Sequence, residues 1–275
     1  MSLPVDTLIY SLITGIFVGI AAGYLGSLMV LERMSLVGDA LSHVALPGLA
    51  LGYVYHFNQF IGAFAFLFIS AIIIWQLRRI TKLPFETIVG AMFTLALAIG
   101  ILILPQVDLL EALFGNIASV SLTYTLAAVA CSIIAVIATK LIYNRLVLGM
   151  ISEDLALSKG INIGRVNLIY LLLVSLIVAI GIQITGTLLV GFLVIVPAAA
   201  AKSISSNLKK YAILSAVFGA GSTSIGIIAS TLILRTTLEL TLIVGPFIVF
   251  SGLIIFIITS IIKWRSSRLI LSRRP

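Results

Sequence analysis

Charged side chains are scarce in this chain. Of its 275 residues only 9% are Asp, Glu, Lys or Arg, whereas 61% are hydrophobic. A soluble globular protein carries roughly 25% charged residues. The composition therefore excludes an ordinary soluble domain and indicates a protein whose solvent is the lipid bilayer.

Cysteine is almost absent as well. A single residue, Cys131, excludes an internal disulfide. It lies in an apolar run, where a free cysteine is usually a small buried hydrophobe and seldom a metal ligand. Thiolate ligands are thus not expected to contribute to any metal site.

The sequence also lacks the common signatures of enzymes. It contains no Gly-x-x-x-x-Gly-Lys-Ser/Thr loop, and its one Lys-Ser pair, Lys202–Ser203, follows alanines. A phosphate-binding loop needs backbone donors exposed by glycine. We therefore expect no catalytic residues, and any ATP hydrolysis must come from a separate polypeptide. Without a basic patch that contains aromatic residues, no nucleic-acid partner is expected either.

Long apolar runs are what the sequence does contain. At about 20 residues per crossing, they predict an all-α integral membrane bundle of about eight or nine transmembrane helices, as a single permease domain over residues 1–275. Two pairs of runs meet almost directly, near Phe57–Asn58 and near Ile184, which favours tight hairpins or broken helices. The candidate spans are Leu8–Leu31, Leu36–Tyr55, Phe60–Leu77, Thr87–Leu104, Leu122–Tyr143, Val166–Gln183, Thr185–Ala201, Tyr211–Leu234 and Leu240–Ile262.

The basic residues predict the orientation of these spans. Alternating crossings place four basic clusters on one side, which should be cytoplasmic in the cell membrane, together with the C-terminus. Nine crossings put the N-terminus outside, and eight would reverse it. The clusters are Arg78, Arg79 and Lys82; Lys140, Arg145, Lys159 and Arg165; Lys202, Lys209 and Lys210; and Lys263, Arg265, Arg268, Arg273 and Arg274.

Small residues recur in the first apolar run. Gly15, Gly19 and Gly23 are spaced to form a groove along one helix face. Such a groove lets another helix approach closely, and we expect helix packing to be its role.

One acidic and one basic side chain interrupt the second apolar run, in the stretch GDALSHVALPG. Asp39 and His43 are four residues apart, which places both on one face of a helix. Pro47, one turn further on, should kink the helix and free a carbonyl near the pair. The stretch therefore predicts an oxygen ligand, a nitrogen ligand and irregular backbone in one place.

Three interpretations of this pair remain open at the level of sequence. A carboxylate at the bilayer centre costs several kcal/mol or more unless it has a partner, so a functional role is favoured. The pair could lock two helices by a mutual hydrogen bond, form a proton relay, or bind a cation. Carboxylate and imidazole ligands suit zinc, manganese or ferrous iron, and two ligands make a loose site of the kind that transport requires.

Several segments resemble the membrane permeases of ABC transporters that import zinc, manganese or iron. The first apolar run ends in glycine-rich sequence followed by LERMSLVGDALSHVALPGLALG (Leu31–Gly52). Three further motifs keep the family's order: LFGNI (Leu113–Ile117), ISEDLALSKGINI (Ile151–Ile163) and GTLLVGFLVIVPAAAAK (Gly186–Lys202). One departure is LELTLIVGPF (Leu238–Phe247), where many relatives carry an acidic or glycine-rich step, so the outer gate is not defined by the sequence.

The resemblance implies a homodimer of permeases on two ABC ATPase subunits, supplied by an extracellular metal-binding protein. It implies that Asp39 and His43 meet the transported divalent metal, and that no cofactor is permanently bound. It also implies a coupling helix, near Ser152 to Gly160, that docks into the ATPase. The sequence does not choose among manganese, zinc and iron.

Local physics agrees with a short helix in that cytoplasmic stretch. Ser152 can cap its start, with Glu153 and Asp154 favourable in the first turn, and Gly160 can end it in a left-handed conformation. Between them lie Leu155 and Ala156. A helix resting on the membrane surface is the alternative interpretation, because the apolar side of such a helix needs something to cover it.

The second function class that the residues allow is a stand-alone carrier driven by an ion gradient, with the same Asp39–His43 site. Such carriers usually contain more intramembrane acids, and the helix near Glu153 would have no evident task there. Import driven by a separate ATPase is therefore the favoured prediction.

Overall fold

The computed structural model describes residues 5–81, 83–103, 113–115, 120–187, 189–237 and 244–271. Within these ranges the chain is helical, with short connections and no strand. Asn116 and Ile117 of the LFGNI motif and residues 238–243 of the LELTLIVGPF stretch lie outside them. The helices are α1 Val5–Leu31, α2 Ser35–Val44, α3 Leu46–Val54, α4 Gln59–Thr81, α5 Phe85–Ile103, α7 Leu122–Ile151, α8 Glu153–Ser158, α9 Ile163–Thr185, α10 Val190–Ile204, α11 Leu208–Thr237 and α12 Gly245–Leu271.

Eight candidate spans among the described residues are long and apolar enough to cross a membrane. One of them combines α2 and α3, and the shorter α10 is apolar as well. The prediction of an all-α bundle with about eight or nine membrane helices is confirmed. The expected interruptions are also present, since α3 and α4 are separated by a turn and α9 ends at Thr185 just before α10 begins.

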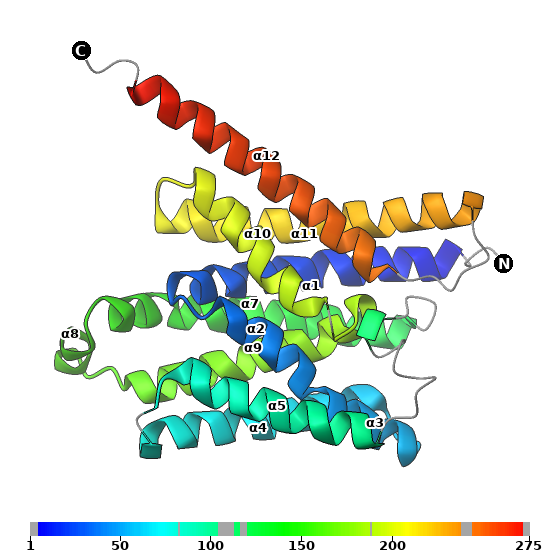
Figure 1. Cartoon of the computed structure of the whole chain (residues 1–275), viewed down its shortest axis with the longest axis horizontal. Coiled ribbons are helices and arrows are strands. Elements are labelled where there is room, and N and C mark those ends of the chain that lie inside the picture. The colour runs from blue at the N-terminus through cyan, green and yellow to red at the C-terminus, as the bar shows by residue number, and fades with distance from the viewer. Residues whose placement is uncertain are drawn as a thin grey trace.

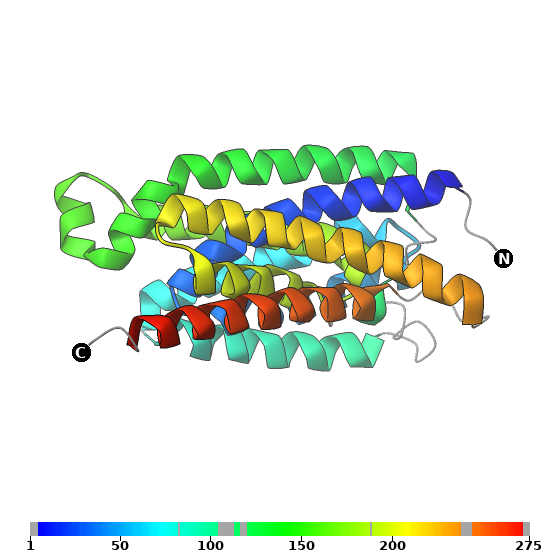
Figure 2. The same ribbon diagram turned by 90° about the horizontal axis from the view of Figure 1, so that it is seen from above.

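The long helices lie side by side, with the two termini at opposite ends of the bundle (Figures 1 and 2). The short helix α8 projects from the same end as the C-terminus. The end of α4, the connection between α10 and α11 and the end of α12 lie there too. Lys82, Arg273 and Arg274 lie outside the described residues. The other members of the basic clusters that we assigned to one side belong to elements that begin or end at this end of the molecule.

Outward-facing side chains of the bundle are apolar. Leu102 is 85% exposed, Leu141 73% and Ile134 58%, and similar residues cover α4, α5, α7 and α12. In water such a surface would drive aggregation, whereas in a bilayer it contacts acyl chains. The exposed surface is thus consistent with the membrane assignment made from composition.

Glycines allow α1 and α11 to cross at backbone contact distance. A methyl group added at Gly19 would lie 2.5 Å from the Gly219 carbonyl oxygen, and one at Gly23 would meet the Ser215 carbonyl. A methyl group at Gly15 would lie 2.5 Å from the Ile227 side chain. In lipid there is no hydrophobic driving force between apolar side chains, so close backbone approach is a main source of helix affinity in membranes. The glycine face of α1 therefore lies against α11.

Glu32 follows the last residue of α1 and is partly buried. Burial raises the pKa of its carboxyl from 4.5 to about 6, although the nearby Arg78 charge opposes the shift. Because the pKa is higher in the folded state, the carboxyl opposes folding only when it is ionised. The resulting loss of folding free energy is absent below about pH 4.5, grows as the pH rises through 6 and then stays at about 1–2 kcal/mol.

Glu32→Gln is accordingly expected to raise the thermal unfolding midpoint in detergent at pH 7.5 and to leave it nearly unchanged at pH 4.5. Comparing the two midpoints across this pH range by tryptophan fluorescence measures the effect. An equal gain at both pH values would mean that ionisation of Glu32 is not the cause.

Candidate functional site

The membrane span that contains Asp39 and His43 is divided into two helices, α2 and α3. Ala45 separates α2 from α3, and Pro47 lies in the first turn of α3. Pro47 has no N–H to donate to the preceding turn. At the break, the Ala45 nitrogen donates to the Ser42 oxygen over a long distance of 3.4 Å. The predicted break beside the pair is therefore confirmed.

Asp39 and His43 share one face of α2 but differ in exposure. The Asp39 side chain is exposed, whereas His43 is only 9% exposed. The His43 ring packs edge-on against Phe93 of α5, with 5.3 Å between ring centroids. Its Nδ1 atom is buried and has no hydrogen-bond partner among the described residues. An unpaired buried nitrogen is costly, and this one weighs against a bond that merely locks two helices together.

Helix α10 forms the wall on the other side of Asp39. A methyl group added at Gly191 would lie 2.5 Å from the Asp39 Cα atom and 2.9 Å from its backbone nitrogen. One added at Gly38 would lie 3.7 Å from Val194. Gly191 therefore lets α10 touch the backbone that carries the carboxylate. Sequence spacing could not identify this neighbour, because Asp39 and Gly191 lie far apart in the chain.

A further buried hydroxyl lies in the connection that precedes α10. Helices α2 and α10 run in opposite directions (Figure 1). Gly191 lies against Asp39. Thr187 lies four residues before Gly191, in the connection between α9 and α10. Thr187 is fully buried, and its Oγ1 atom has no partner in the described part of the chain.

Gly191→Ala is expected to lower transport at least roughly tenfold, because the new methyl group must push the Asp39 backbone away, and a 1 Å misplacement can cost about 100-fold. Uptake by vesicles that contain equal amounts of folded protein measures this loss. Gly90→Ala is the matched control, since a methyl group at that membrane glycine meets nothing within 4 Å. Equal uptake by the two variants would contradict the assigned contact.

One copy of the chain offers an incomplete set of ligands. Across the described ranges no group of three or more His, Cys, Asp or Glu side chains could hold a metal ion. The other histidine, His56, is exposed in the turn before α4. Any cation at Asp39 and His43 would need further ligands from water, from hydroxyl groups or from another chain.

The second predicted element, the short helix, is present as α8. Ser152 accepts a bond from the Leu155 nitrogen at 3.2 Å and caps its start. Gly160 has φ +71°, and the Ile161 nitrogen donates to the Ala156 oxygen at 3.0 Å, which closes a Schellman motif. The predicted caps are thus confirmed.

Helix α8 presents most of its surface outward. Ala156 is buried, while Glu153 and Asp154 are exposed and Leu155 and Leu157 are 45% and 61% exposed. Ala156 is the one buried residue of α8. Its charged and leucine faces remain open to a partner.

Two of the other sequence motifs meet at the opposite end of the bundle. Gly115 of LFGNI and Gly186 both have positive φ, at +74° and +78°. A methyl group at Gly115 would lie 2.7 Å from the Gly186 nitrogen, and one at Gly186 would meet the Leu113 carbonyl. Only glycine adopts positive φ without strain and leaves room for so close a backbone contact. The described part of the motif, Leu113 to Gly115, thereby packs over the connection between α9 and α10.

The sequence profile of the ABC 3 transport family matches residues 5–263. The chain belongs to the ABC 3 transport family. It is 32% identical, over 79% of its length and 80% of the relative's, to the manganese import system permease protein ScaB of Streptococcus gordonii. The high-affinity zinc uptake system membrane protein ZnuB of Buchnera aphidicola is 28% identical, over 94% of this chain and 98% of that one.

Solved structures show the same fold for this ABC 3 family member. PsaBC from Streptococcus pneumoniae, solved in complex with Fab, is 31% identical and superposes with a TM-score of 0.77 over 92% of this chain and 90% of the other. An inward-facing metal-chelate type ABC transporter gives 0.73 at 17% identity, over 91% and 84% of the two chains. The second likeness supports the fold alone.

Proposed function

We propose that this chain is the permease subunit of an ATP-driven importer of divalent transition-metal ions, and that Asp39 and His43 receive the ion. The observation that carries the proposal is a buried imidazole nitrogen that no described residue pairs with, one helical turn from an exposed carboxylate, beside a helix break. These ligands suit manganese, zinc or iron. The family and its manganese and zinc permeases support the same substrate class.

The working unit that we propose is a homodimer. Asp39 faces outward in one copy, and a single copy supplies two of the ligands that such an ion needs. A second copy that contributes its own Asp39 and His43 would complete a four-ligand site and would cover the exposed carboxylate. Symmetric pairing is the commonest way for identical chains to share a site.

The mechanism that we propose is alternating access. An extracellular metal-binding protein delivers the ion to the end of the bundle where Gly115 meets Gly186. Separate ATPase subunits bind α8 at the other end, which lies in the cytoplasm with the C-terminus. ATP binding and hydrolysis shift the permease between its two states because the ATPase has different affinities for them. A helix held by one buried alanine can move without disrupting the bundle core.

Transport by the reconstituted complex tests this function. Vesicles containing the permease and its ATPase should accumulate radioactive manganese or zinc only when ATP is present on the ATPase side, and competing divalent metals rank the substrates. A stand-alone carrier would instead respond to an imposed ion gradient without ATP. Gradient-driven uptake by the permease alone would therefore overturn the proposal in favour of that class.

A further inference from the structure

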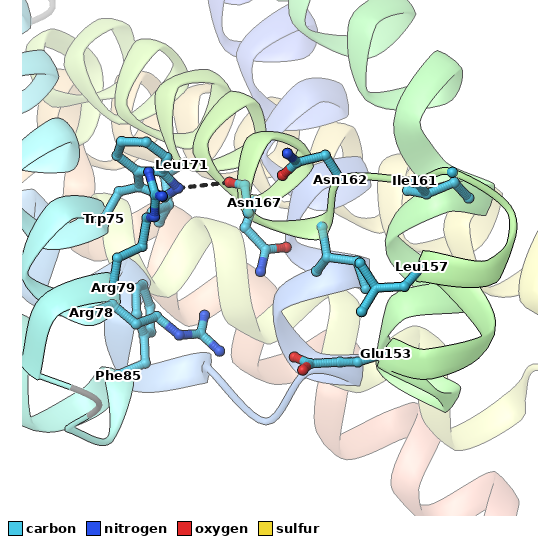
Figure 3. Close-up of a pocket in the computed structure, with 13 residues that line it drawn as sticks. Trp75, Arg78, Arg79, Phe85, Glu153, Leu157, Ile161, Asn162, Asn167 and Leu171 are labelled. Atoms are coloured by element: carbon cyan, nitrogen blue, oxygen red, sulfur yellow. Dashed lines mark hydrogen bonds between the residues drawn. The ribbon is translucent and has the colours of Figure 1, made fainter.

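A cavity of about 540 Å³ lies where the end of α4 and the start of α5 approach α8 and the start of α9. Its polar lining consists chiefly of Trp75, Arg78, Arg79, Glu153, Asn162 and Asn167. Figure 3 shows the guanidinium of Arg78 directed across the cavity toward the side on which Glu153 lies. The metal site and the α8 caps account for none of the arginine, tryptophan or Asn167 side chains.

Both arginines are held by aromatic rings. Arg78 stacks over Phe85 at 5.2 Å and Arg79 over Trp75 at 4.9 Å, measured from the guanidinium carbon to the ring centroid. No carboxylate oxygen of the described residues lies within 4.0 Å of either guanidinium, and neither donates a hydrogen bond there. Stacking occupies the face of a guanidinium and leaves the N–H donors at its edge free. Two fixed cations with unused donors therefore border one cavity.

Neighbouring groups add donors to the same space. The Asn162 side-chain oxygen accepts from the Arg165 nitrogen at 3.1 Å, which leaves its NH₂ group available. The Trp75 indole donates to the Gly164 carbonyl at 2.7 Å and ties α4 to the start of α9. Glu153 is the one carboxylate in the lining, against two guanidinium groups. The lining thus carries one net positive charge and an excess of donors, which fits a singly charged anion. The Glu32 carboxyl, with which the Arg78 charge interacts, does not line the cavity.

The position of the cavity indicates where such an anion comes from. Arg78 and Arg79 lie in the last turn of α4, a candidate membrane span that ends at Thr81. Leu77 and Ile80, in the same turn, are 37% and 68% exposed. Basic pockets between helices at this depth bind the headgroups of anionic lipids, and tryptophan is enriched at the same level.

We propose that this cavity binds the phosphate of an anionic phospholipid headgroup, with Arg78 and Arg79 as its ligands and the acyl chains along the exposed face of α4. Phosphatidylglycerol, with one negative charge, neutralises the site. A lipid held there contacts both α8 and the membrane helices. The bilayer would then help to position the helix that projects from the bundle.

Native mass spectrometry of the full-length chain, titrated with phosphatidylglycerol in detergent, tests this proposal. Arg78→Gln/Arg79→Gln should weaken lipid binding at least about tenfold, since a hydrogen bond to a charged group is worth about 1.5–3 kcal/mol. Lys209→Gln/Lys210→Gln is the matched control: it removes two charges from exposed residues at the same end that do not line the cavity, and it should change binding less than about twofold. If the glutamine pair fails to fold, Arg78→Lys/Arg79→Lys keeps the charge but removes the planar edge, and it should still weaken binding.

Three outcomes would overturn the proposal. If Lys209→Gln/Lys210→Gln weakened lipid binding as much as the arginine variant, the lipid would be attracted to positive charge in general and not to this cavity. Inorganic phosphate that displaces the lipid at equal concentration would mean that a soluble anion is the ligand. Loss of lipid on addition of the ATPase, together with loss of ATPase binding in the arginine variant, would assign the cavity to the protein interface. The assay uses neither metal nor ATP, so its failure leaves the transport proposal standing.

Discussion

Asp39→Ala and His43→Ala are each expected to abolish metal uptake by the reconstituted complex, with a loss of at least roughly 100-fold. Removal of groups that only support metal ligands already costs about 10–100-fold. The ligands themselves should matter more. Initial rates of manganese or zinc uptake by vesicles of known permease content measure the loss.

The control for this prediction concerns folding. His43 is buried against Phe93, so His43→Ala leaves a small void, whereas His43→Gln fills most of it without providing an imidazole. Asp39 is exposed in the single chain, so Asp39→Asn should leave the unfolding midpoint unchanged. Both conservative variants should remain inactive while their ATPase still binds. Normal uptake by the double variant would eliminate the pair as an ion site.

Leu155→Glu is expected to separate the permease from its ATPase. Leu155 is 45% exposed on α8 and lies between the caps of that helix, so a charge there should not unfold the chain. A leucine that enters an apolar groove of a partner typically contributes about 1.5–3 kcal/mol, and a buried unpaired carboxylate costs more. Co-purification of the ATPase and ATP-dependent uptake should both fall at least about tenfold.

The matched control is Leu208→Glu, at the start of α11. Leu208 is 42% exposed and lies at the same end of the bundle, away from α8. Its replacement should leave the ATPase bound. Cysteine pairs between α8 and the ATPase provide an independent measurement, because several positions along a docked helix should cross-link. ATPase association that survives Leu155→Glu would favour the alternative in which α8 rests on the membrane.

Much of the fold could be predicted from local patterns. Apolar runs of membrane length predicted the helices, because lipid leaves the backbone few other ways to satisfy its hydrogen bonds. Pro47 predicted the break beside His43, and Ser152 and Gly160 predicted both ends of α8. Each of these signals acts within one or two turns of the chain.

The surroundings of the candidate site could not be predicted in that way. Asp39 and Gly191 are far apart in the sequence, and nothing in either segment specifies that they touch. The same holds for the contact between His43 and Phe93. A buried leucine and a lipid-facing leucine look alike in a sequence, because both lie among apolar neighbours.

The sequence by itself determined three properties: that the chain spans a bilayer, at which residues its helices are interrupted, and which two side chains could hold a cation. Composition and short-range spacing encode all three. Only the tertiary structure decided that α10 lies against Asp39, that no described residue pairs with the His43 Nδ1 atom, and that Arg78 and Arg79 border a cavity beside α8. Those features depend on how distant helices cross, and crossing is set by side-chain packing between segments that the linear order does not relate.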